Sequence, residues 1–356
     1  MKTLEKNSTL NFQGQDFYTG IDVHKRNWKV TIRLNHMELK TFSMNPKPKE
    51  LASHLKKNYP GGNYYSVYEA GFCGFWIHRQ LVELGINNRV VNGADVPTTH
   101  KEKEQKRDPI DSRKLARELE NQSLKGIYIP SEQQQALRSL ARLYYQISRD
   151  QTRIKNRIKS FLHFNGIVLP RVDEMSHWSA RFIDWLKTVP LKKEHDRYYL
   201  KQIIEHLQYK RQETLNVLRY MRASVRDNQI VFLLRSVCGI GFITAFTLYA
   251  ELMDMRRFKN SDRLAAFIGF VPSVYGTDEK ERKLGLSRRY SRYLRNRLIE
   301  SAWVAVRSDP ALTLSYSHCI KRMQKKKAIV RIARKLLNRI RYVWINEKIY
   351  VPGIIE

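Results

Sequence analysis

Four carboxylates stand where their spacing could create a divalent-metal site. Asp22 and Glu69 each end a short apolar segment, and Asp108 and Asp111 stand three residues apart at the start of a helical pattern, hence on one helix face. Clustered carboxylates repel one another unless cations neutralise them, and their oxygens suit Mg²⁺ or Mn²⁺. Two such ions about 4 Å apart polarise a scissile phosphate and stabilise both the attacking and the leaving oxygen.

Each of these residues also has an ordinary structural interpretation. An Asp that follows a strand is often a turn residue, and Asp108 can simply cap the helix that Pro109 begins. Taken together and in this order, the four carboxylates favour the metal site. His24 either positions a water or a phosphate, or is a structural histidine. Basic side chains flank the carboxylates in sequence, as phosphate contacts would: Lys25, Arg107, Arg113 and Lys114.

The elements that would hold these residues follow the order of a ribonuclease-H-like domain. Apolar and alternating segments predict strands over 17–23, 28–34, 38–43, 64–68 and 88–91, and helices over 50–57, 75–84 and 108–120. In such a sheet the first and fourth strands are neighbours, so Asp22 and Glu69 would converge. We expect an α/β catalytic domain over residues 12–125.

The middle of the chain predicts two long helices. Apolar positions recur in steps of three and four from Leu137 to Phe161, which is a heptad seam with one polar break at Gln151. A weaker seam runs from Ile203 to Met221. We expect a helical coiled-coil region over residues 131–228, formed within one chain or between protomers. An ordinary helical bundle is the alternative.

Residues 229–350 predict a third domain that is basic and mostly helical. Residues 237–241 (VCGIG) lie between two apolar helices, where they either aim backbone N–H groups at a phosphate or form a simple packed turn. Residues 273–285 contain Gly and charges and predict a loop. Residues 287–306 and 328–345 predict basic helices.

The charge of the chain indicates a polyanionic partner. Its 65 Lys and Arg against 34 Asp and Glu give a net charge of +31. Nucleic acid is the first expectation and an anionic membrane surface the alternative. Residues 280–341 contain 19 Lys and Arg against 3 acidic residues, as a phosphate-facing surface requires. The candidate contacts there are Arg288, Arg289, Arg292, Arg295, Lys325, Lys326, Lys327 and Arg331.

Several other classes are excluded by composition. A chain of 356 residues with 42% hydrophobic residues builds a folded core. No apolar run reaches the roughly 18 residues of a spanning helix, and the first eleven residues lack the apolar core of a secretion signal. Three widely spaced cysteines suit neither a disulfide framework nor a zinc site. We expect a cytoplasmic protein with no membrane partner.

The carboxylate motifs resemble the signature of a bacterial insertion-sequence family. Residues 20–25 (GIDVHK), 68–71 (YEAG) and 107–113 (RDPIDSR) resemble the Asp-Glu-Asp-Asp motif of the DEDD transposases, whose N-terminal domain is RuvC-like. Residues 233–241, 265–272 and 294–300 are similar to that family's second conserved domain, a serine-type transposase domain. The resemblance spans about residues 17–343 and implies a DNA transposase or recombinase.

The resemblance also implies how such an enzyme works. A structured bridge RNA would pair with both donor and target DNA, and the protein would act as a homodimer or homotetramer at the bacterial nucleoid. The four carboxylates would bind Mg²⁺ (or Mn²⁺) and activate the scissile phosphate. A serine of the second domain would form a transient 5′-phospho-protein link, which a free 3′ hydroxyl reverses after strand exchange.

The nucleophile position departs from the family pattern. The family's serine lies a few residues after the Pro that ends the segment matched here by 265–272, usually just before a Gly. In this chain that place is Thr277, followed by Asp278. Threonine has the hydroxyl, but its methyl group crowds an in-line attack. We expect Thr277 to be the nucleophile; the other interpretations are that Ser273 substitutes for it or that this copy is impaired.

Two further functions stay open. A Mg²⁺-dependent, structure-selective nuclease resembling a junction resolvase would need only the four carboxylates. A non-catalytic nucleic-acid-binding protein would use the basic surface and keep the carboxylates as structural groups. Dependence on Mg²⁺ and a covalent protein–DNA species separate the three functions.

Overall fold

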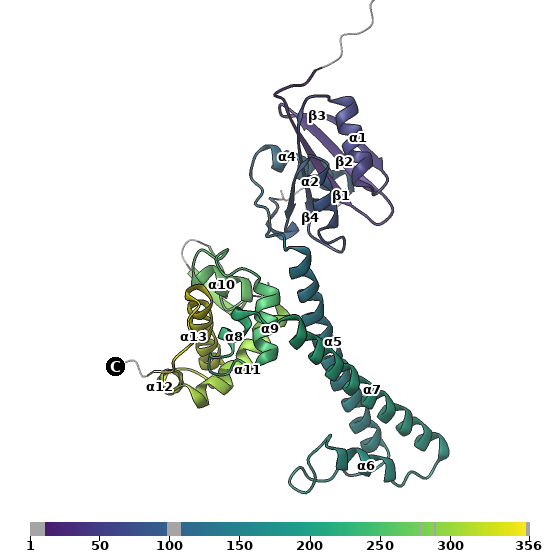
Figure 1. Cartoon of the computed structure of the whole chain (residues 1–356), viewed down its shortest axis with the longest axis vertical. Coiled ribbons are helices and arrows are strands. Elements are labelled where there is room, and N and C mark those ends of the chain that lie inside the picture. The colour runs from purple at the N-terminus through teal and green to yellow at the C-terminus, as the bar shows by residue number, and fades with distance from the viewer. Residues whose placement is uncertain (1–10, 98–107, 278–279, 288–289, 354–356) are drawn as a thin grey trace, which may run out of the picture. The chain divides into compact units, whose positions relative to one another are not determined.

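The N-terminal part of the chain folds around a five-stranded sheet (Figure 1). The computed structural model describes residues 11–97, 108–277, 280–287 and 290–353, and for residues 108–110, 273–277 and 280–284 it describes the backbone alone. The strands lie in the order β3-β2-β1-β4-β5, and β1 pairs antiparallel with β2 and parallel with β4. Their bounds are β1 Asp16–Val23, β2 Trp28–Leu34, β3 Met37–Met44, β4 Asn63–Glu69 and β5 Asn87–Val91.

Helices cover both faces of this sheet. Strand side chains alternate between faces, so Phe17, Ile21 and Tyr68 join the apolar core under α1 (Pro48–Asn58) and α2 (Trp76–Glu83). Val67, on the opposite face, joins a second core with residues of α4 (Asp108–Glu120). A short 3-10 helix, η1 (Gly93–Asp95), follows β5. The mixed α/β architecture with its five-stranded sheet confirms the strands and helices predicted from the sequence, and their order is consistent with a ribonuclease-H-like domain.

Two long helices open the second part of the chain. α5 (Glu132–Phe164) begins at a capping box in which the hydroxyl of Ser131 accepts a hydrogen bond from the backbone N–H of Gln134. α7 (Glu194–Ser224) packs against the later half of α5, and α6 (Ala180–Thr188) closes the apolar core between them. The two predicted long helices are confirmed and pair within one chain; a supercoil between them stays a prediction.

The polar break in the α5 seam faces polar positions of α7. Gln151 Nε2 donates to the carbonyl oxygen of Lys210 at 3.0 Å and to Thr214 Oγ1 at 2.5 Å. Both acceptors lie on the weaker of the two predicted seams. The Gln151 amide therefore forms hydrogen bonds to α7 at the one seam position that lacks an apolar side chain. These bonds satisfy the amide and keep α5 and α7 in contact through the break.

The early half of the α5 seam packs on a different core. Leu137, Leu140 and Tyr144 contact a buried cluster built by the C-terminal helices. Glu251 of α9, only 3% exposed, pairs there with Arg138 and Arg142 of α5 at 3.3 and 2.8 Å. The helices of this cluster are α8 Gln229–Leu234, α9 Phe242–Leu252, α10 Ser261–Ile268, α11 Arg292–Ser308, α12 Pro310–Ile320 and α13 Lys325–Asn346.

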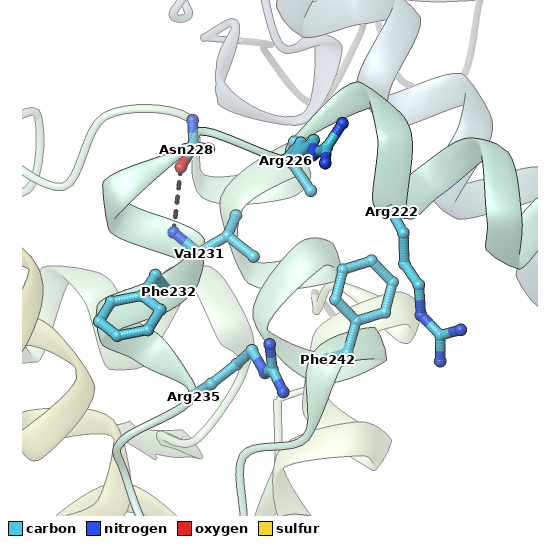
Figure 2. A pocket seen from close by; sticks show the side chains of 8 residues that line it. Arg222, Arg226, Asn228, Val231, Phe232, Arg235 and Phe242 are labelled. Atoms are coloured by element: carbon cyan, nitrogen blue, oxygen red, sulfur yellow. Dashed lines mark hydrogen bonds between the residues drawn. The ribbon is translucent and has the colours of Figure 1, made fainter.

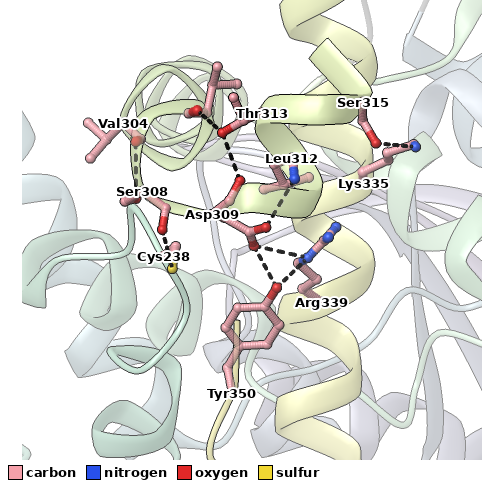
Figure 3. Close-up of polar contacts among 11 residues, drawn as sticks. Cys238, Val304, Ser308, Asp309, Leu312, Thr313, Ser315, Lys335, Arg339 and Tyr350 are labelled. Carbon is pink, nitrogen blue, oxygen red and sulfur yellow. Dashed lines mark hydrogen bonds and ion pairs between the residues drawn. The ribbon is translucent and has the colours of Figure 1, made fainter. Parts of the chain in front are cut away.

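A buried polar cluster ties the last described segment to this core (Figure 3). Asp309 is fully buried and caps α12 by accepting from the N–H of Leu312 at 3.0 Å. Its other carboxylate oxygen accepts from the phenol of Tyr350 at 2.5 Å and pairs with Arg339 Nε of α13 at 3.4 Å. The backbone N–H of Tyr350 donates to Ser236 Oγ at 2.8 Å. One carboxylate thus joins α12, α13 and the segment after α13.

One predicted loop is wrong. Residues 273–285 fall largely within an antiparallel hairpin, β6 (Pro272–Thr277) and β7 (Lys280–Leu286). Charged residues are frequent in this segment and leave no regular alternation of apolar and polar residues, so the sequence contains no strand signal there. The predicted basic helices over 287–306 and 328–345 correspond to α11 and α13.

The chain divides into two compact units, Met1–Ile129 and Pro130–Glu356. The predicted first domain, 12–125, falls in the first unit, and the predicted regions 131–228 and 229–350 share the second. Within the described ranges, no helix combines the length and the apolar character needed to cross a membrane.

Candidate active site

The two strand-end carboxylates lie beside each other in the sheet. Ile21 of β1 is in register with Tyr68 of the parallel strand β4. The next residue of each strand is Asp22 and Glu69, at neighbouring carboxyl ends. Because residues in register on parallel strands point to the same face, both side chains belong to the face that carries Gly20 and Val67.

Helix α4 packs on that same face at very short range. A Cβ atom at Gly20 would collide with the backbone carbonyl of Ser112 and the backbone nitrogen of Ala116. The buried hydroxyl of Ser112 lies 2.9 Å from Thr31 Oγ1 of β2. The absence of a side chain at Gly20 therefore allows the helix to approach the strand backbone.

The direction of α4 places its first turn beside the strand-end carboxylates. At the far end of the helix, Glu120 accepts from Arg33 Nε of β2 at 2.7 Å. Arg33 is in register with Tyr18, near the start of β1, so α4 runs antiparallel to β1. Asp111 directly precedes Ser112, and Asp108 lies about one helical turn before it. The start of α4 therefore lies toward the end of β1, where Asp22 stands two residues beyond Gly20.

Several polar contacts surround the carboxylates. Asp22 Oδ2 lies 2.9 Å from His24 Nε2, and the Asp22 side chain is 20% exposed. Asp111 Oδ1 lies 3.5 Å from the ammonium of Lys114. The carboxylate of Glu69 lies so close to Gly93 that a Cβ there would collide with it. The edge is thus polar, partly open to solvent and lined by oxygen donors.

Three of the four predicted carboxylates have described side chains: Asp22 and Glu69 end neighbouring strands, and Asp111 lies in the first turn of α4, the helix that packs on that face of the sheet. The fourth, Asp108, begins α4, and its side chain lies outside the described atoms. Among the described residues, no three His, Cys, Asp or Glu side chains converge closely enough to hold a metal ion. A four-carboxylate metal site at this edge therefore stays a prediction.

The predicted phosphate contacts near these carboxylates differ in their surroundings. Lys25 is exposed and lies over the ring of Phe72, 6.0 Å from its centroid. Arg113 donates to Glu38 of β3 at 3.1 Å, and Lys114 is 7% exposed and faces Asp111. Arg107 lies outside the described residues. In this conformation Arg113 and Lys114 form ion pairs with Glu38 and Asp111 of the same chain.

Thr277, the predicted nucleophile, ends β6 at the tip of the hairpin. Its backbone is in register with Lys280, the first residue of β7. Ser273 lies near the opposite end of β6, four residues away along the strand. The two hydroxyl-bearing positions therefore stand near different ends of one strand, and Thr277 is at the end that leads to β7.

The turn over residues 237–241 packs tightly against α11. Gly239 has a φ of +81°, and a Cβ there would collide with the carbonyl of Ser301. Gly241 caps α9 and provides no side-chain hydrogen bond. The packed-turn interpretation accounts for Gly239, while the first N–H groups of α9 can donate hydrogen bonds to an anion.

The predicted nucleic-acid contacts of the C-terminal unit include exposed side chains and one side chain that is hydrogen-bonded within the protein. Arg295 donates to the carbonyls of Gly269 and Ser287 at 3.1 and 2.8 Å, so its guanidinium holds α10 and the hairpin together. Arg288 and Arg289 lie outside the described residues. The remaining side chains are exposed at the start of α11 and along α13: Arg292, Lys325, Lys326, Lys327 and Arg331.

Sequence reasoning missed one further basic group. Arg222, Arg226 and Arg235 line a single pocket in the C-terminal unit. They come from the last turn of α7, the turn that follows it and the end of α8. Because they belong to different elements, no helical or strand periodicity in the sequence groups them together. A high local density of arginine was the one signal available.

Two family models match the chain. Residues 19–165 match the model of the DEDD transposase of the IS110 type. Residues 232–317 match the model described as the transposase IS116/IS110/IS902 family. The first match contains the carboxylates of the sheet edge, and the second contains the hairpin with Thr277.

Relatives of the chain extend across both units. It is 28% identical over 321 residues to a Sinorhizobium fredii protein described as transposase y4rJ, covering 83% of this chain and 81% of the relative. It is 24% identical over 274 residues to the transposase for insertion sequence element IS1111A of Coxiella burnetii, covering 77% and 74%. It is 28% identical over 205 residues to the transposase for IS1328 of Yersinia enterocolitica, covering 57% and 59%.

Proposed function

We propose that this chain, which belongs to the IS116/IS110/IS902 family of transposases, cuts and rejoins the DNA of an insertion sequence under the guidance of a structured RNA. The observation that carries the catalytic half of this proposal is the sheet edge. There Asp22 and Glu69 end the neighbouring strands β1 and β4, and Asp108 and Asp111 lie in the first turn of α4, which packs on the same face of the sheet. The proposal is that these four carboxylates act together at this edge.

The donor set fits a hard divalent cation. Carboxylate oxygens from neighbouring strand ends and one helix turn are the ligands that Mg²⁺ and Mn²⁺ prefer, and no thiolate takes part. Asp22, Glu69, Asp108 and Asp111 would hold the cation. When bound, Mg²⁺ supplies polarisation of the scissile phosphate and neutralises charge on the leaving oxygen.

The protein's own hydroxyl provides the nucleophile in this proposal. Thr277 Oγ1 attacks the phosphorus of the scissile phosphate; an oxygen–phosphorus bond to the protein forms, and the bond to the 3′ oxygen breaks. The result is a 5′-phospho-protein link and a free 3′ hydroxyl, and a second 3′ hydroxyl later restores the phosphodiester and frees Thr277.

The basic residues bind the nucleic acids. Exposed Lys and Arg side chains on α11 and α13 neutralise backbone phosphates without reading sequence, while base pairing by a guide RNA supplies the specificity. A homodimer or homotetramer completes the assembly. The net charge of +31 supports binding of more than one nucleic-acid strand.

Substitution of the sheet-edge carboxylates tests this function. The purified chain is combined with element-end DNA, target DNA and its co-purifying RNA, with and without Mg²⁺. Asp22→Asn and Asp111→Asn should abolish recombination and leave DNA binding within about twofold, because each keeps the side-chain volume and removes only the charge that holds the cation. Asp173→Asn, at an exposed aspartate far from this edge in the sequence, is the matched control.

The outcomes separate the three candidate functions. Mg²⁺-dependent joining through a covalent protein–DNA species supports the proposal. Mg²⁺-dependent cleavage without a covalent species indicates the nuclease instead. Binding with no Mg²⁺-dependent chemistry, or full activity in Asp22→Asn, removes the metal-site proposal.

A further inference from the structure

A pocket of about 290 Å³ lies at the junction of α7, α8 and α9. Figure 2 shows Arg235 reaching between Phe232 and Phe242, with Arg222 and Arg226 at the rim. The side chain of Asn228 accepts a hydrogen bond from the N–H of Val231 at 3.0 Å and so caps α8, the helix that forms one side of the pocket. The pocket therefore combines three guanidinium groups with two phenyl rings, and the Asn228 side chain caps the helix that carries Phe232.

The three arginines of this pocket have no acidic partner in the part of the chain that the structure describes. Arg222, Arg226 and Arg235 are exposed and make no ion pair there. Other arginines of the same unit are paired: Arg142 with Glu251 at 2.8 Å and Arg339 with Asp309 at 3.4 Å. Three like charges around one small cavity repel one another, and an anionic ligand would relieve that repulsion.

The phenyl rings of the pocket are also unusual for a folded surface. Phe232 is 64% exposed although it belongs to a helix whose neighbouring residues Val231 and Leu233 are buried. Phe242 is the first residue of α9, and the centroid of its ring lies 5.6 Å from the guanidinium carbon of Arg222. Aromatic side chains placed among guanidinium groups offer a flat surface on which a planar ligand stacks.

The ligand that satisfies both features is a nucleotide with an accessible base. The carboxylates of an acidic peptide would form ion pairs with the arginines, but they would leave the phenyl rings without a planar group to stack on. Duplex DNA offers phosphates but keeps its bases stacked inside the helix. A cavity of about 290 Å³ is at the lower end of the size of ligand pockets, which suits a single nucleotide unit.

We propose that this pocket binds one unpaired nucleotide of a nucleic-acid strand, with the base stacked on Phe232 and the flanking phosphates paired with Arg222, Arg226 and Arg235. The α9 helix begins at the pocket, and its N-cap Gly241 has no side-chain cap, so the positive end of the helix adds to the attraction for phosphate. The inference rests on the proposed function in that the enzyme handles nucleic acid. The strand is either the guide RNA or a displaced DNA strand, since both offer the same phosphate and base chemistry.

Binding of single strands and duplexes by the full chain tests the inference. Fluorescein-labelled DNA and RNA of one sequence are titrated alone and annealed to their complements. Phe232→Ala should weaken single-strand binding by about tenfold, the loss of one stacked base, and leave duplex binding within about twofold. Phe232→Trp should restore the affinity. Phe164→Ala, at a phenylalanine that is 89% exposed and outside the pocket, is the matched control.

Salt dependence and base fluorescence provide two further readouts. Arg235→Ala should lower the slope of log affinity against log salt by about 0.7 for a single strand, which corresponds to one lost phosphate contact. Arg181→Ala, at an exposed arginine of α6 outside the pocket, should leave single-strand affinity above that of Arg235→Ala. A 2-aminopurine base in the single strand should be quenched by the wild-type chain and not by Phe232→Ala.

Each outcome decides the inference. Selective loss with either RNA or DNA supports it and identifies the strand. Equal loss for single strands and duplexes, no loss in Phe232→Ala, or the same loss in Phe164→Ala overturns it while leaving the proposed function intact. A wild-type chain that binds no nucleic acid at all overturns both.

Discussion

Gly20 of β1 lies directly against the backbone of Ser112 in α4, so closely that no side chain fits between them. This contact determines how near the helix that carries Asp108 and Asp111 comes to the strand that carries Asp22. Gly20→Ala should push α4 away from the sheet, with a loss of about 1 to 3 kcal/mol in the free energy of unfolding. Because the carboxylates then separate, Mg²⁺-dependent DNA cleavage should fall by at least tenfold.

A second glycine of the same unit provides the control for that substitution. A Cβ at Gly126 would have the carbonyl oxygen of Val90 as its nearest neighbour, at 3.9 Å, and this glycine has no positive φ. Gly126→Ala should leave both the unfolding free energy and DNA cleavage close to those of the wild type. Unchanged cleavage in Gly20→Ala would show that the close approach of α4 is not needed for catalysis.

Thr277 at the hairpin tip leads to the second prediction. Thr277→Ser should keep or raise activity, because it retains the hydroxyl and removes the methyl group that crowds an in-line attack. Thr277→Ala should end covalent linkage between protein and DNA. The covalent species is measured as a labelled DNA strand that migrates with the protein after denaturation.

Ser273 is the internal control for the nucleophile. Ser273→Ala should leave the covalent species at its wild-type level, because this residue lies near the other end of β6. If Thr277→Ala still links and Ser273→Ala does not, the assignment passes to Ser273. If both variants link, the nucleophile is neither residue.

Glu251 leads to a prediction about stability. Its buried carboxylate is the shared partner of Arg138 and Arg142 and joins α5 to α9. Glu251→Ala should lower the free energy of unfolding by about 3 to 5 kcal/mol, because it leaves two partly buried guanidinium groups without their counter-charge. Chemical denaturation measures the change, and Glu205→Ala on α7, which forms no ion pair among the described residues, should change it little. Equal losses in the two variants would contradict the role assigned to Glu251.

The sheet could be predicted from the sequence, whereas the hairpin could not. β1, β2 and β4 contain enough buried residues, such as Ile21, Val30 and Tyr68, to produce a clear apolar pattern. β6 and β7 contain Gly276, Lys280 and Arg282 in register positions and show no such pattern. Pairing between these two strands depends on backbone hydrogen bonds, which the order of side chains in the sequence indicates only weakly.

The candidate sites show the same division. Asp22 and Glu69 could be placed together because each ends a strand, and a strand order fixes which ends are neighbours. The ion pair of Asp111 with Lys114 follows from a spacing of three on one helix. The pocket of Arg222 and Arg235 could not be predicted, since its members meet only after α7, α8 and α9 have packed.

Tyr350 leads to a prediction about alkaline pH. Burial, and then its hydrogen bond to Asp309, raise the pKa of the phenol above its ordinary value of 10.0. A group whose pKa is raised on folding stabilises the folded state below the unfolded pKa, and this contribution is lost as the pH rises through the folded pKa. Tyr350→Phe should therefore lower the free energy of unfolding by about 1 to 2 kcal/mol at pH 8. The difference between wild type and variant should shrink as the pH rises above about 10. Urea denaturation at pH 8 and above about pH 10 measures the difference in unfolding free energy between wild type and variant. The same difference at both pH values would show that the hydrogen bond from the Tyr350 phenol to Asp309 contributes nothing to the stability of the C-terminal unit.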